Sequence, residues 1–523
     1  MSTADAAAAP LELLRERLAE LADLEAVSGL LGWDQETMMP PGGVHARADH
    51  LATLDRLAHE RLTAVEVGDW LEALNGSPVQ ERPADGGVPA GEPHVPADRD
   101  AALVRVVRRD RDKALRVPPT LRTELARART LGQHAWAQAR AADDFAAFLP
   151  HLREIVDLTR RYIACFPEAE HPYDAVLDDY EPGMRTAQVR GVFAQLRDGL
   201  LPLMAAIERA REEGTAPEPL VGPFAVDAQR ALVRGMLLDV GFDPGYSRLD
   251  ESQHPFSTTV SLDDQRITAR FTEDSLEALF AGLHEFGHAL YDSQVDRALE
   301  RTPLCTGVSS SVHESQSRLW ENMVGRGRAC ATFLLPRLRT AFPGSFEDLD
   351  TGGLYRAVNV VRPSLIRVQA DEVTYALHII LRFELELELF EGTLEPEQLA
   401  DAWRERVRSY LGIEVPDDAR GVLQDIHWSF GGFGYFPTYA LGNLIAAQLW
   451  ERINRDIPDL DEHIAAGDFA PLRDWLGLHV HRFGRMFTPA QTLQRAIGSD
   501  LDPGPFLDYL WAKHADVHGV SRS

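Results

Sequence analysis

Hydrophobic residues recur every three or four positions along most of this chain, and that spacing places them on one face of a helix. The clearest case is the run Leu11, Leu14, Leu18, Leu21 and Leu24, with Arg, Glu and Asp in between. The same pattern predicts helices at about 121–145, 149–165, 186–213, 273–295, 311–335, 370–390, 396–411 and 437–453. The chain is therefore expected to be mostly helical.

One stretch has the short, Thr-, Val- and Ile-bearing pattern of β-strands. Residues 256–271, FSTTVSLDDQRITARF, predict two short strands around Asp263 and Asp264. The predicted helix at 273–295 follows directly in the sequence. We therefore expect a mainly α protein with a small β-sheet beside one helix.

The segment 75–100 lacks this patterning. It holds five prolines and four glycines in 26 residues, with almost no large apolar side chains. A segment of this kind cannot bury enough apolar surface to order itself. We predict a flexible surface loop between helices.

Composition narrows the range of functions. The 523 residues correspond to roughly three domains, or to one large multilobed unit, at about 150 residues per domain. The chain carries 53 Lys and Arg against 81 Asp and Glu, a net charge of −28. Nucleic acids and anionic membrane surfaces select clustered positive charge, so this balance argues against both as partners.

The three cysteines indicate a reducing compartment. Cys165, Cys305 and Cys330 are odd in number and widely spaced, which fits neither a disulfide framework nor a Cys-x-x-Cys metal site. The N-terminus lacks the positive and apolar regions of a signal peptide, and no run reaches 18 apolar residues. We expect neither a signal peptide nor a transmembrane span.

His284-Glu285-Phe286-Gly287-His288 is an H-E-x-x-H motif within the helix predicted at 273–295. On a helix, residues four apart lie about 40° apart around the axis, so His284 and His288 point at one spot. Glu285 lies on the same side and could reach a metal-bound water. The alternative is a pair of histidines with no ligand role.

A catalytic zinc usually takes three protein ligands and keeps one position open. Glu314 follows His288 by 26 residues, a helix-turn-helix distance, and lies in another predicted helix. His313 is the alternative third ligand. Adjacent residues on a helix diverge by about 100°, so only one of the two should point inward. The set His284, His288 and Glu314 matches a His₂Glu zinc site, which cobalt can also occupy.

These parts predict metal-assisted amide hydrolysis. Zinc would lower the pKa of bound water towards about 7. Glu285 would take the proton as general base and later pass it to the leaving amine.

The sequence as a whole resembles the carboxypeptidase Taq family of metallocarboxypeptidases, from about Leu11 to the C-terminus. The resemblance rests on ordered matches: LGWDQETMMPPGG (31–43), YDAVLDDYEPGM (173–184), HPF (254–256), DQRIT (264–268), HEFGH (284–288), HESQSRLWEN (313–322), IRVQADEVTYALHIILRFELE (366–386), GVLQDIHW (421–428) and GYFPTYALGN (434–443). Residues 75–100 depart from the pattern as an insertion between two N-terminal helices.

The resemblance implies one catalytic unit over 1–523, built of two helical lobes around a deep substrate groove with zinc at its floor. It implies removal of single residues from peptide C-termini with broad specificity, a cytoplasmic location and a homodimer. It assigns His284, His288 and Glu314 as metal ligands and Glu285 as general base.

A carboxypeptidase must hold a free carboxylate near the scissile bond, and arginine does this through paired charge-assisted hydrogen bonds. Arg266 and Arg367 both lie in matching motifs. We favour Arg367 for the carboxylate and Arg266 as a second cation closing the groove. The alternative for each is a surface salt bridge.

Further candidates lie in the other matching motifs. His427 and Tyr435 could donate to the developing negative charge, and glycines at 431, 432 and 434 would make their segment a mobile loop. Core packing is the alternative for both. His254 precedes Pro255, is expected to be extended, and could line the groove. His463, His479 and His481 are interpreted as structural or surface histidines.

Two other functions remain open at this stage. A zinc oligopeptidase or endopeptidase would use the same ligands, and a non-catalytic metal- or peptide-binding helical protein could retain an inactive site. Against the second, Glu285 has no chemical purpose in an inactive site.

Overall fold

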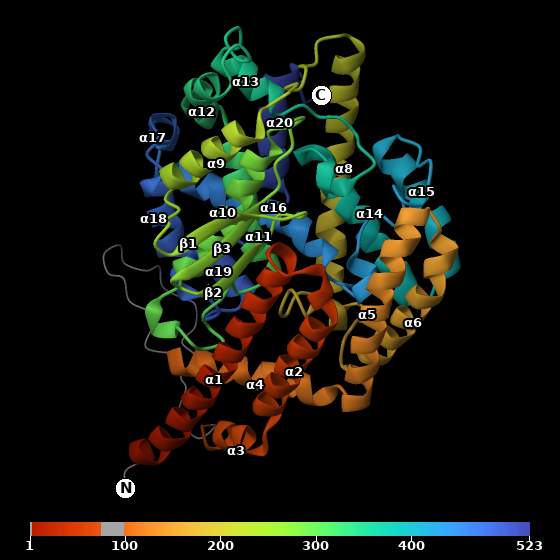
Figure 1. Ribbon diagram of the computed structural model, residues 1–523, viewed down its shortest axis with the longest axis vertical. Helices are drawn as coiled ribbons and strands as arrows, with labels where there is room; N and C mark the ends of the chain where they lie inside the picture. Colours follow the sequence, from red (N-terminus) through yellow and green to blue (C-terminus); the bar gives the residue numbers. More distant parts are fainter. Residues whose placement is uncertain (1–2, 75–98, 523) are drawn as a thin grey trace.

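Long amphipathic helices make up most of the molecule, as the leucine periodicity predicts. The computed structural model describes residues 3–74 and 99–522. Figure 1 shows the helices surrounding a small sheet. The mainly α fold with a small β-sheet is confirmed. The loop predicted at 75–100 lies outside the described residues, except that Arg99 and Asp100 begin a helix.

The N-terminal helices form their own small hydrophobic core. Leu14 and Leu18 of the predicted leucine run are fully buried in it, against Val107. Phe483 and Met486, from near the other end of the chain, complete this core. The helices of this part are α1 (Thr3–Thr37), α2 (Val44–Thr63), α3 (Val65–Ala73) and α4 (Arg99–Arg116).

In the next part of the chain, α5 and α6 lie at the right of the molecule, whereas α9 lies at the left beside α10 (Glu277–Ser293) (Figure 1). The paired helices α5 and α6 lie beside one another, and the longer α8 contacts α14 and α20. The bounds are α5 (Pro119–Ala142), α6 (Phe145–Ile163), α7 (Asp174–Leu177), α8 (Thr186–Glu212) and α9 (Val226–Val240).

The sheet has three strands in the order β1-β3-β2. They are β1 (Ser247–Glu251), β2 (Ser257–Ser261) and β3 (Asp264–Ala269), with β1 parallel and β2 antiparallel to β3. The two predicted strands are β2 and β3. Strand β1, with the sequence SRLDE, was not predicted, because it is largely polar and lies at an edge of the sheet.

Two helices flank this sheet. The metal-motif helix α10 (Glu277–Ser293) contacts β2 and β3, and α1 contacts β2 from the other side. Two successive residues of β2 show which face of the sheet each helix covers. Thr259 donates a hydrogen bond to Asp292 of α10 at 2.7 Å, whereas Thr258 lies against Gly29 of α1. The predicted sheet beside α10 is therefore confirmed.

The helix predicted at 311–335 is interrupted, which corrects that expectation. Helix α11 (Ser310–Arg318) runs into a π-helical segment, Leu319–Gly325, and α12 (Arg328–Ala341) begins after a break. A Cβ at Gly327 would lie 2.5 Å from the Met323 carbonyl oxygen. The chain turns there in a way that the apolar periodicity alone does not reveal.

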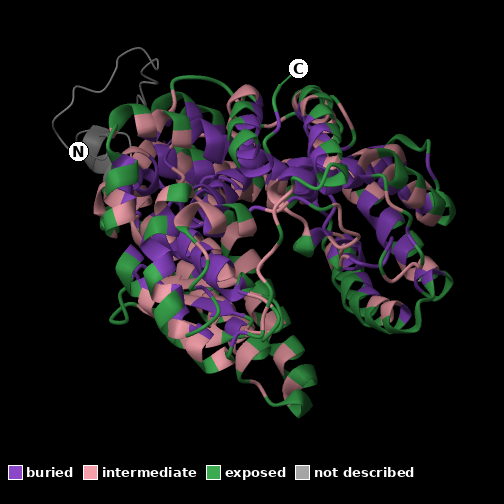
Figure 2. Cartoon of the chain, turned by 90° about the horizontal axis from the view of Figure 1, so that it is seen from above, coloured by how far each residue is buried: buried purple, intermediate pink, exposed green. Residues whose placement is uncertain are grey.

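The C-terminal half builds the main core around α14 and α16. Its remaining helices are α13 (Thr351–Ala357), α14 (Glu372–Glu391), α15 (Leu399–Leu411), α16 (Phe436–Asp456), α17 (Leu460–Ala466), α18 (Ala470–His479), α19 (Pro489–Ala496) and α20 (Gly504–His518). Seen from above, the described chain spreads into two groups of helices that meet along one side, each with a buried interior (Figure 2).

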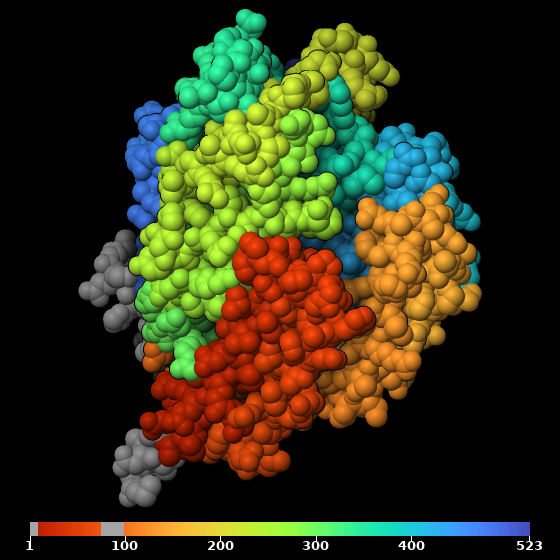
Figure 3. All heavy atoms as spheres, in the orientation of Figure 1, coloured from red at the N-terminus to blue at the C-terminus, as the bar shows by residue number. Residues whose placement is uncertain are grey.

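The molecular surface is hollowed on one face. In the space-filling view the hollow lies between the N-terminal helices and α5 (Figure 3). Within the described ranges, no helix is both long and apolar enough to span a membrane. The larger division predicted from the sequence, one catalytic unit of two lobes over 1–523, stays a prediction.

Candidate metal centre

Two histidines of α10 and one glutamate of α11 converge on one point. Ligand atoms of His284, His288 and Glu314 all lie within 4.8 Å of one another. The Nε2 atoms of His284 and His288 lie 3.6 and 3.4 Å from Glu314 Oε2. The structure therefore brings the predicted set together, and it selects Glu314 over its neighbour His313.

Glycines on two helices let α11 approach closely. A Cβ at Gly287 of α10 would lie 2.5 Å from the Gln316 carbonyl oxygen, and one at Gly442 of α16 would lie 2.6 Å from Glu314 Cγ. Contacts this short exclude any side chain unless the backbone shifts. Helix α11 is thus held between α10 and α16, which fixes the direction in which Glu314 points.

The outer nitrogen of His284 faces a carboxylate. His284 Nδ1 lies 2.9 Å from Glu321 Oε2, in the π-helical segment. Arg318 donates to Glu314 at 2.7 Å and to Glu321 at 3.2 Å, so one guanidinium joins the two carboxylates. With its Nδ1–H donated to Glu321, His284 presents the lone pair of Nε2 to the ligand set.

The outer nitrogen of His288 faces another imidazole. His288 Nδ1 and His313 Nδ1 are 2.6 Å apart, and His313 Nε2 lies 3.2 Å from Asp292 Oδ1. If His313 donates its Nε2–H to Asp292, its Nδ1 accepts from His288. This arrangement again leaves the Nε2 lone pair of His288 directed at Glu314 and the ligand set.

Charge and burial set the protonation of the site. Burial opposes ionisation of Glu314, but Arg318 and His284 outweigh it and hold the pKa of that carboxyl well below its usual range. Burial raises the pKa of Glu285 to about 7, against the opposing effect of His284. Two imidazole nitrogens and one anionic oxygen, with no cation inserted among them, suit a divalent metal.

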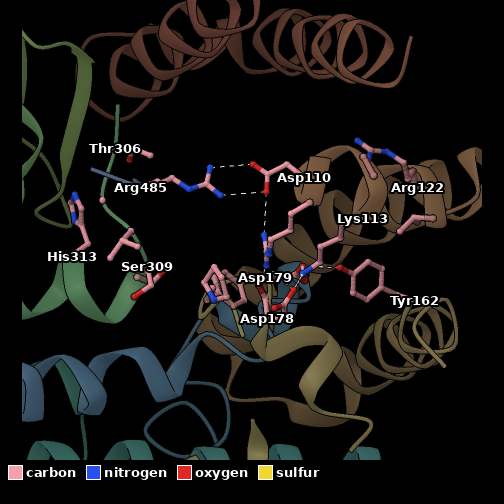
Figure 4. Close-up of a pocket in the computed structure, with 18 residues that line it drawn as sticks. Asp110, Lys113, Arg122, Tyr162, Asp178, Asp179, Thr306, Ser309, His313 and Arg485 are labelled. Carbon is pink, nitrogen blue, oxygen red and sulfur yellow. Dashed lines mark hydrogen bonds and ion pairs between the residues drawn. The ribbon is translucent and has the colours of Figure 1, made fainter. Parts of the chain in front are cut away.

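An open cavity adjoins this centre. It has a volume of about 540 Å³ and reaches His313, the partner of His288. Figure 4 shows the loop before α11 on one side and residues of α4, α5 and α6 on the other. Its polar lining includes Arg109, Asp110, Lys113, Arg122, Tyr162, Asp178, Asp179, Ser309 and Arg485.

Arg367 lies on another side of the ligand set and is almost completely buried. Its Nε and Nη2 each lie 2.9 Å from Asp425 Oδ1, and its Nη1 donates to the Tyr375 hydroxyl at 3.1 Å. Arg318, which binds Glu314, stacks over the same Tyr375 ring at 4.3 Å. Tyr375 thus connects Arg367 with the metal-ligand region.

Arg382 shares the carboxylate that binds Arg367. Its Nε donates to Asp425 Oδ2 at 2.7 Å. Asp425 therefore accepts hydrogen bonds from two guanidinium groups.

The structure does not bring Arg266 or His254 to the metal ligands. Arg266 on β3 pairs with Asp264 at 2.9 Å and stacks over Trp33 of α1 at 4.5 Å. Its cross-strand neighbour Thr258 faces α1, so Arg266 points to the sheet face opposite α10. His254 is exposed in the connection between β1 and β2.

His427 and Tyr435 lie together, and Tyr435 is near enough to Glu314 to be affected by its charge. Their rings are 5.5 Å apart, and His427 Nε2 is 3.2 Å from the Tyr439 hydroxyl. Burial, followed by the nearby Arg367, lowers the pKa of His427 to about 3, so its imidazole is neutral. Burial raises the pKa of Tyr435 to about 12, and the charge of Glu314 adds to the effect.

Three other histidines, interpreted from the sequence as structural or surface residues, contact neighbouring side chains. His481 is buried and hydrogen-bonds Gln294 at 2.7 Å and Gln316 at 2.8 Å. His463 pairs with Asp468, and His479 stacks on Trp475.

Sequence reasoning missed two buried glutamates next to the centre. Glu181 accepts hydrogen bonds from the Ser311 amide and hydroxyl at the start of α11. Glu386 of α14 accepts from the segment that carries His427 and Tyr435. Both lie in the matching motifs, and that position was the available signal.

This chain is similar to known proteins over most of its length. Residues 13–514 match the family model described as carboxypeptidase Taq (M32) metallopeptidase. The chain is 41% identical to thermostable carboxypeptidase 1 of Thermus thermophilus, over 96% of this chain and 97% of that one. It is 34% identical to carboxypeptidase 1 of Bacillus subtilis, over 94% and 95%.

Solved structures agree. The M32 carboxypeptidase from Deinococcus radiodurans R1 superposes with a TM-score of 0.91 at 39% identity, covering 98% of this chain and 100% of that one. Metallocarboxypeptidase 1 of Trypanosoma cruzi gives 0.90 at 33%, over 96% and 99%. The predicted class, a metal-dependent peptide hydrolase, is confirmed: the chain belongs to the carboxypeptidase Taq (M32) family of metallopeptidases.

Proposed function

We propose that this chain is a zinc carboxypeptidase that removes the C-terminal residue of peptides with broad specificity. The observation that carries the proposal is the convergence of His284, His288 and Glu314 with Glu285 on the same helix. The named carboxypeptidases that it resembles over nearly their whole length support the exopeptidase assignment.

Each protein group has a distinct role. The metal ion, when bound, supplies a Lewis acid and an activated water. Glu285 removes a proton and returns it to the leaving amine. His427 and Tyr435 donate hydrogen bonds to the negative charge that develops on the carbonyl oxygen.

Arg367 binds the substrate carboxylate. Arg367 and Arg382 share the single carboxylate of Asp425, which leaves one positive charge uncompensated in this pair. Arg382 is fully buried, whereas Arg367 retains 6% of its surface, so Arg367 is the group that a substrate can reach. Arg266 and His254 lie further away and would contact a more distant part of the substrate.

The proposal extends to the metal, the compartment and the oligomeric state. The His₂Glu set favours zinc, with cobalt as a substitute. The three free cysteines and the net charge of −28 favour a cytoplasmic protein that does not bind nucleic acid. The homodimer rests on the family resemblance alone.

Mass spectrometry of peptide products over time tests the reaction. Stepwise loss of C-terminal residues, abolished by a chelator and restored by Zn²⁺, is the expected result. Internal cleavage of a peptide with an amidated C-terminus would show an endopeptidase. Binding of peptide without any cleavage by the metal-loaded chain would show a non-catalytic protein.

Glu285→Gln tests the general base. We expect kcat to fall by about 10²- to 10⁴-fold while the protein still binds one metal ion, because the amide cannot accept the proton. Metal content measured on the same sample is the control. Near-native turnover would exclude Glu285 as the base.

Arg367→Ala tests the carboxylate clamp. We expect kcat/KM for free peptides to fall by about 10²-fold, while the already poor cleavage of an amidated peptide changes little. Arg362→Ala is a matched control, because Arg362 pairs with Glu218 at the surface. An unchanged preference for free C-termini would refute the clamp.

A further inference from the structure

The segment from His427 to Tyr435 carries two proposed donors on a backbone that has little stiffness of its own. Residues 427–430 form a single 3₁₀ turn, and Gly431 and Gly434 follow with φ of +69° and +87°. Glycine loses more conformational freedom than other residues when it is fixed. The positions of His427 and Tyr435 therefore depend on contacts from outside the segment.

Glu386 supplies such contacts from the middle of α14. Its side chain is fully buried. The Trp428 indole donates to Oε1 at 2.7 Å, and the Gly434 amide donates to Oε2 at 3.0 Å. Oε2 also accepts from the Tyr173 hydroxyl at 2.6 Å, so one carboxylate accepts three hydrogen bonds.

Two of these donors are direct neighbours of the proposed catalytic groups. Trp428 follows His427, and Gly434 precedes Tyr435. The two ends of the segment are thus bound to the two oxygens of one carboxyl group. Close packing restrains the segment further. The backbone of Gly434 lies so near the Val176 carbonyl that a Cβ there would be 2.5 Å from the carbonyl oxygen.

Only a carboxylate satisfies this set of donors. All three groups donate, and an ionised carboxylate accepts at both oxygens. The amide of glutamine would direct an NH₂ group at either the indole or the pair formed by Gly434 and Tyr173. A buried donor without an acceptor costs about 1–3 kcal/mol, so the segment would move to relieve the conflict.

We propose that Glu386 is a positioning residue, whose carboxylate fixes the segment 427–435 so that His427 and Tyr435 face the metal-ligand set. The inference rests on the proposed function for the roles of those two residues. Glu386 would act through His427 and Tyr435, because its own hydrogen bonds go to the segment and to Tyr173, and it does not line the cavity.

Hydrogen exchange tests the positioning without using activity. In Glu386→Gln, amides in peptides covering 427–435 should exchange at least about tenfold faster than in the unaltered protein, since the Gly434 amide loses its acceptor. Glu384→Gln is the matched control. Glu384 lies on the same helix but accepts from the Tyr410 hydroxyl at 2.6 Å, away from this segment. Unchanged exchange in Glu386→Gln would overturn the proposal.

Kinetics of the metal-loaded protein test the consequence. We expect kcat to fall about 10- to 100-fold in Glu386→Gln, with KM and metal content within about twofold, because displaced donors act on the transition state. Tyr173→Phe removes one donor and keeps the carboxylate, so it should give a smaller loss of the same kind. Tyr173→Phe also tests the proposal if Glu386→Gln does not fold.

A double-mutant cycle separates positioning from general destabilisation. In a Tyr435→Phe background, Glu386→Gln should lower kcat by less than about threefold, because part of what it positions is already absent. A full additional loss would overturn the action through Tyr435. If the unaltered protein shows no peptidase activity, the proposed function fails, while the exchange experiment still decides whether Glu386 holds the segment.

Discussion

The two imidazoles of the metal centre lie one helical turn apart on α10, yet different chemistry holds their outer nitrogens. On one side His284 faces the carboxylate of Glu321, which Arg318 also binds. On the other side His288 faces the imidazole of His313, and the carboxylate of Asp292 lies one residue further out. The first ligand faces a carboxylate directly, whereas the second faces an imidazole with a carboxylate behind it.

This difference affects how strongly each imidazole donates its lone pair to a metal ion. The charge of Glu314 and the hydrogen bond of Glu321 overcome burial and raise the pKa of His284. Burial, assisted by His313, lowers the pKa of His288 to about 4. A carboxylate behind an imidazole makes it a better metal ligand, so the outer partners should contribute unequally although the ligands themselves are alike.

Removing a metal ligand should cause the largest loss of metal binding. His284→Ala and His288→Ala should be equally severe, with loss of bound metal and of at least about 10³-fold in activity, because each leaves two protein ligands. Metal analysis after dialysis against Zn²⁺ measures this. Retention of tightly bound metal by only one of the variants would show that the ligands are not equivalent.

Glu321→Gln should have the next largest effect on metal affinity. The amide can still accept from His284 but lacks the charge, and we expect metal affinity to fall about 10- to 100-fold. A competition titration with a chelating dye gives the affinity. Glu277→Gln is the control, because Glu277 also binds an arginine in this region, Arg326, but is largely exposed. A smaller loss than in Asp292→Asn would reverse the comparison.

The hydrogen-bond path from Asp292 to His288 runs through His313, so we expect Asp292→Asn to lose less than about tenfold in metal affinity. The same titration measures the effect. Thr259→Val tests the next contact outward, since Thr259 donates to Asp292, and should change the affinity by less than about threefold.

Gly442→Ala should lower the stability of the protein, and it should also weaken metal binding because Glu314 is displaced. The added methyl group would meet Glu314 and force α11 and α16 apart, at a cost of about 1–3 kcal/mol in the free energy of unfolding. Thermal unfolding measures this. Gly191→Ala in α8 is the control, because a Cβ there has no neighbour within 4 Å, and it should be neutral or stabilising.

The metal ligands could be predicted from sequence because they depend on local geometry. Helical spacing alone directs His284 and His288 to one spot, and Glu314 follows within one helix-turn-helix distance. The main helices were predicted for the same reason, from a periodicity of three and four. The break between α11 and α12 was missed, because it follows from backbone contacts at Gly327 rather than from apolar spacing.

The support of the centre could not be predicted in this way. Glu386 binds Tyr173, which is 213 positions away, and Arg367 binds Asp425, which is 58 positions away. Such pairings depend on the packing of whole helices, which a single sequence does not display. Arg266 shows the same limit, because its motif match gave no information on which face of the sheet it occupies.

The small N-terminal core has a consequence for the order in which the protein is made. Leu14 and Leu18 share that core with Phe483 and Met486, so its first and last members leave the ribosome about 470 residues apart. At about 5–20 residues per second, the leucine face of α1 waits roughly half a minute to a minute and a half for its last partners. Chaperones that cover exposed apolar helices should therefore bind nascent chains of this protein through α1, and release them only near the end of translation.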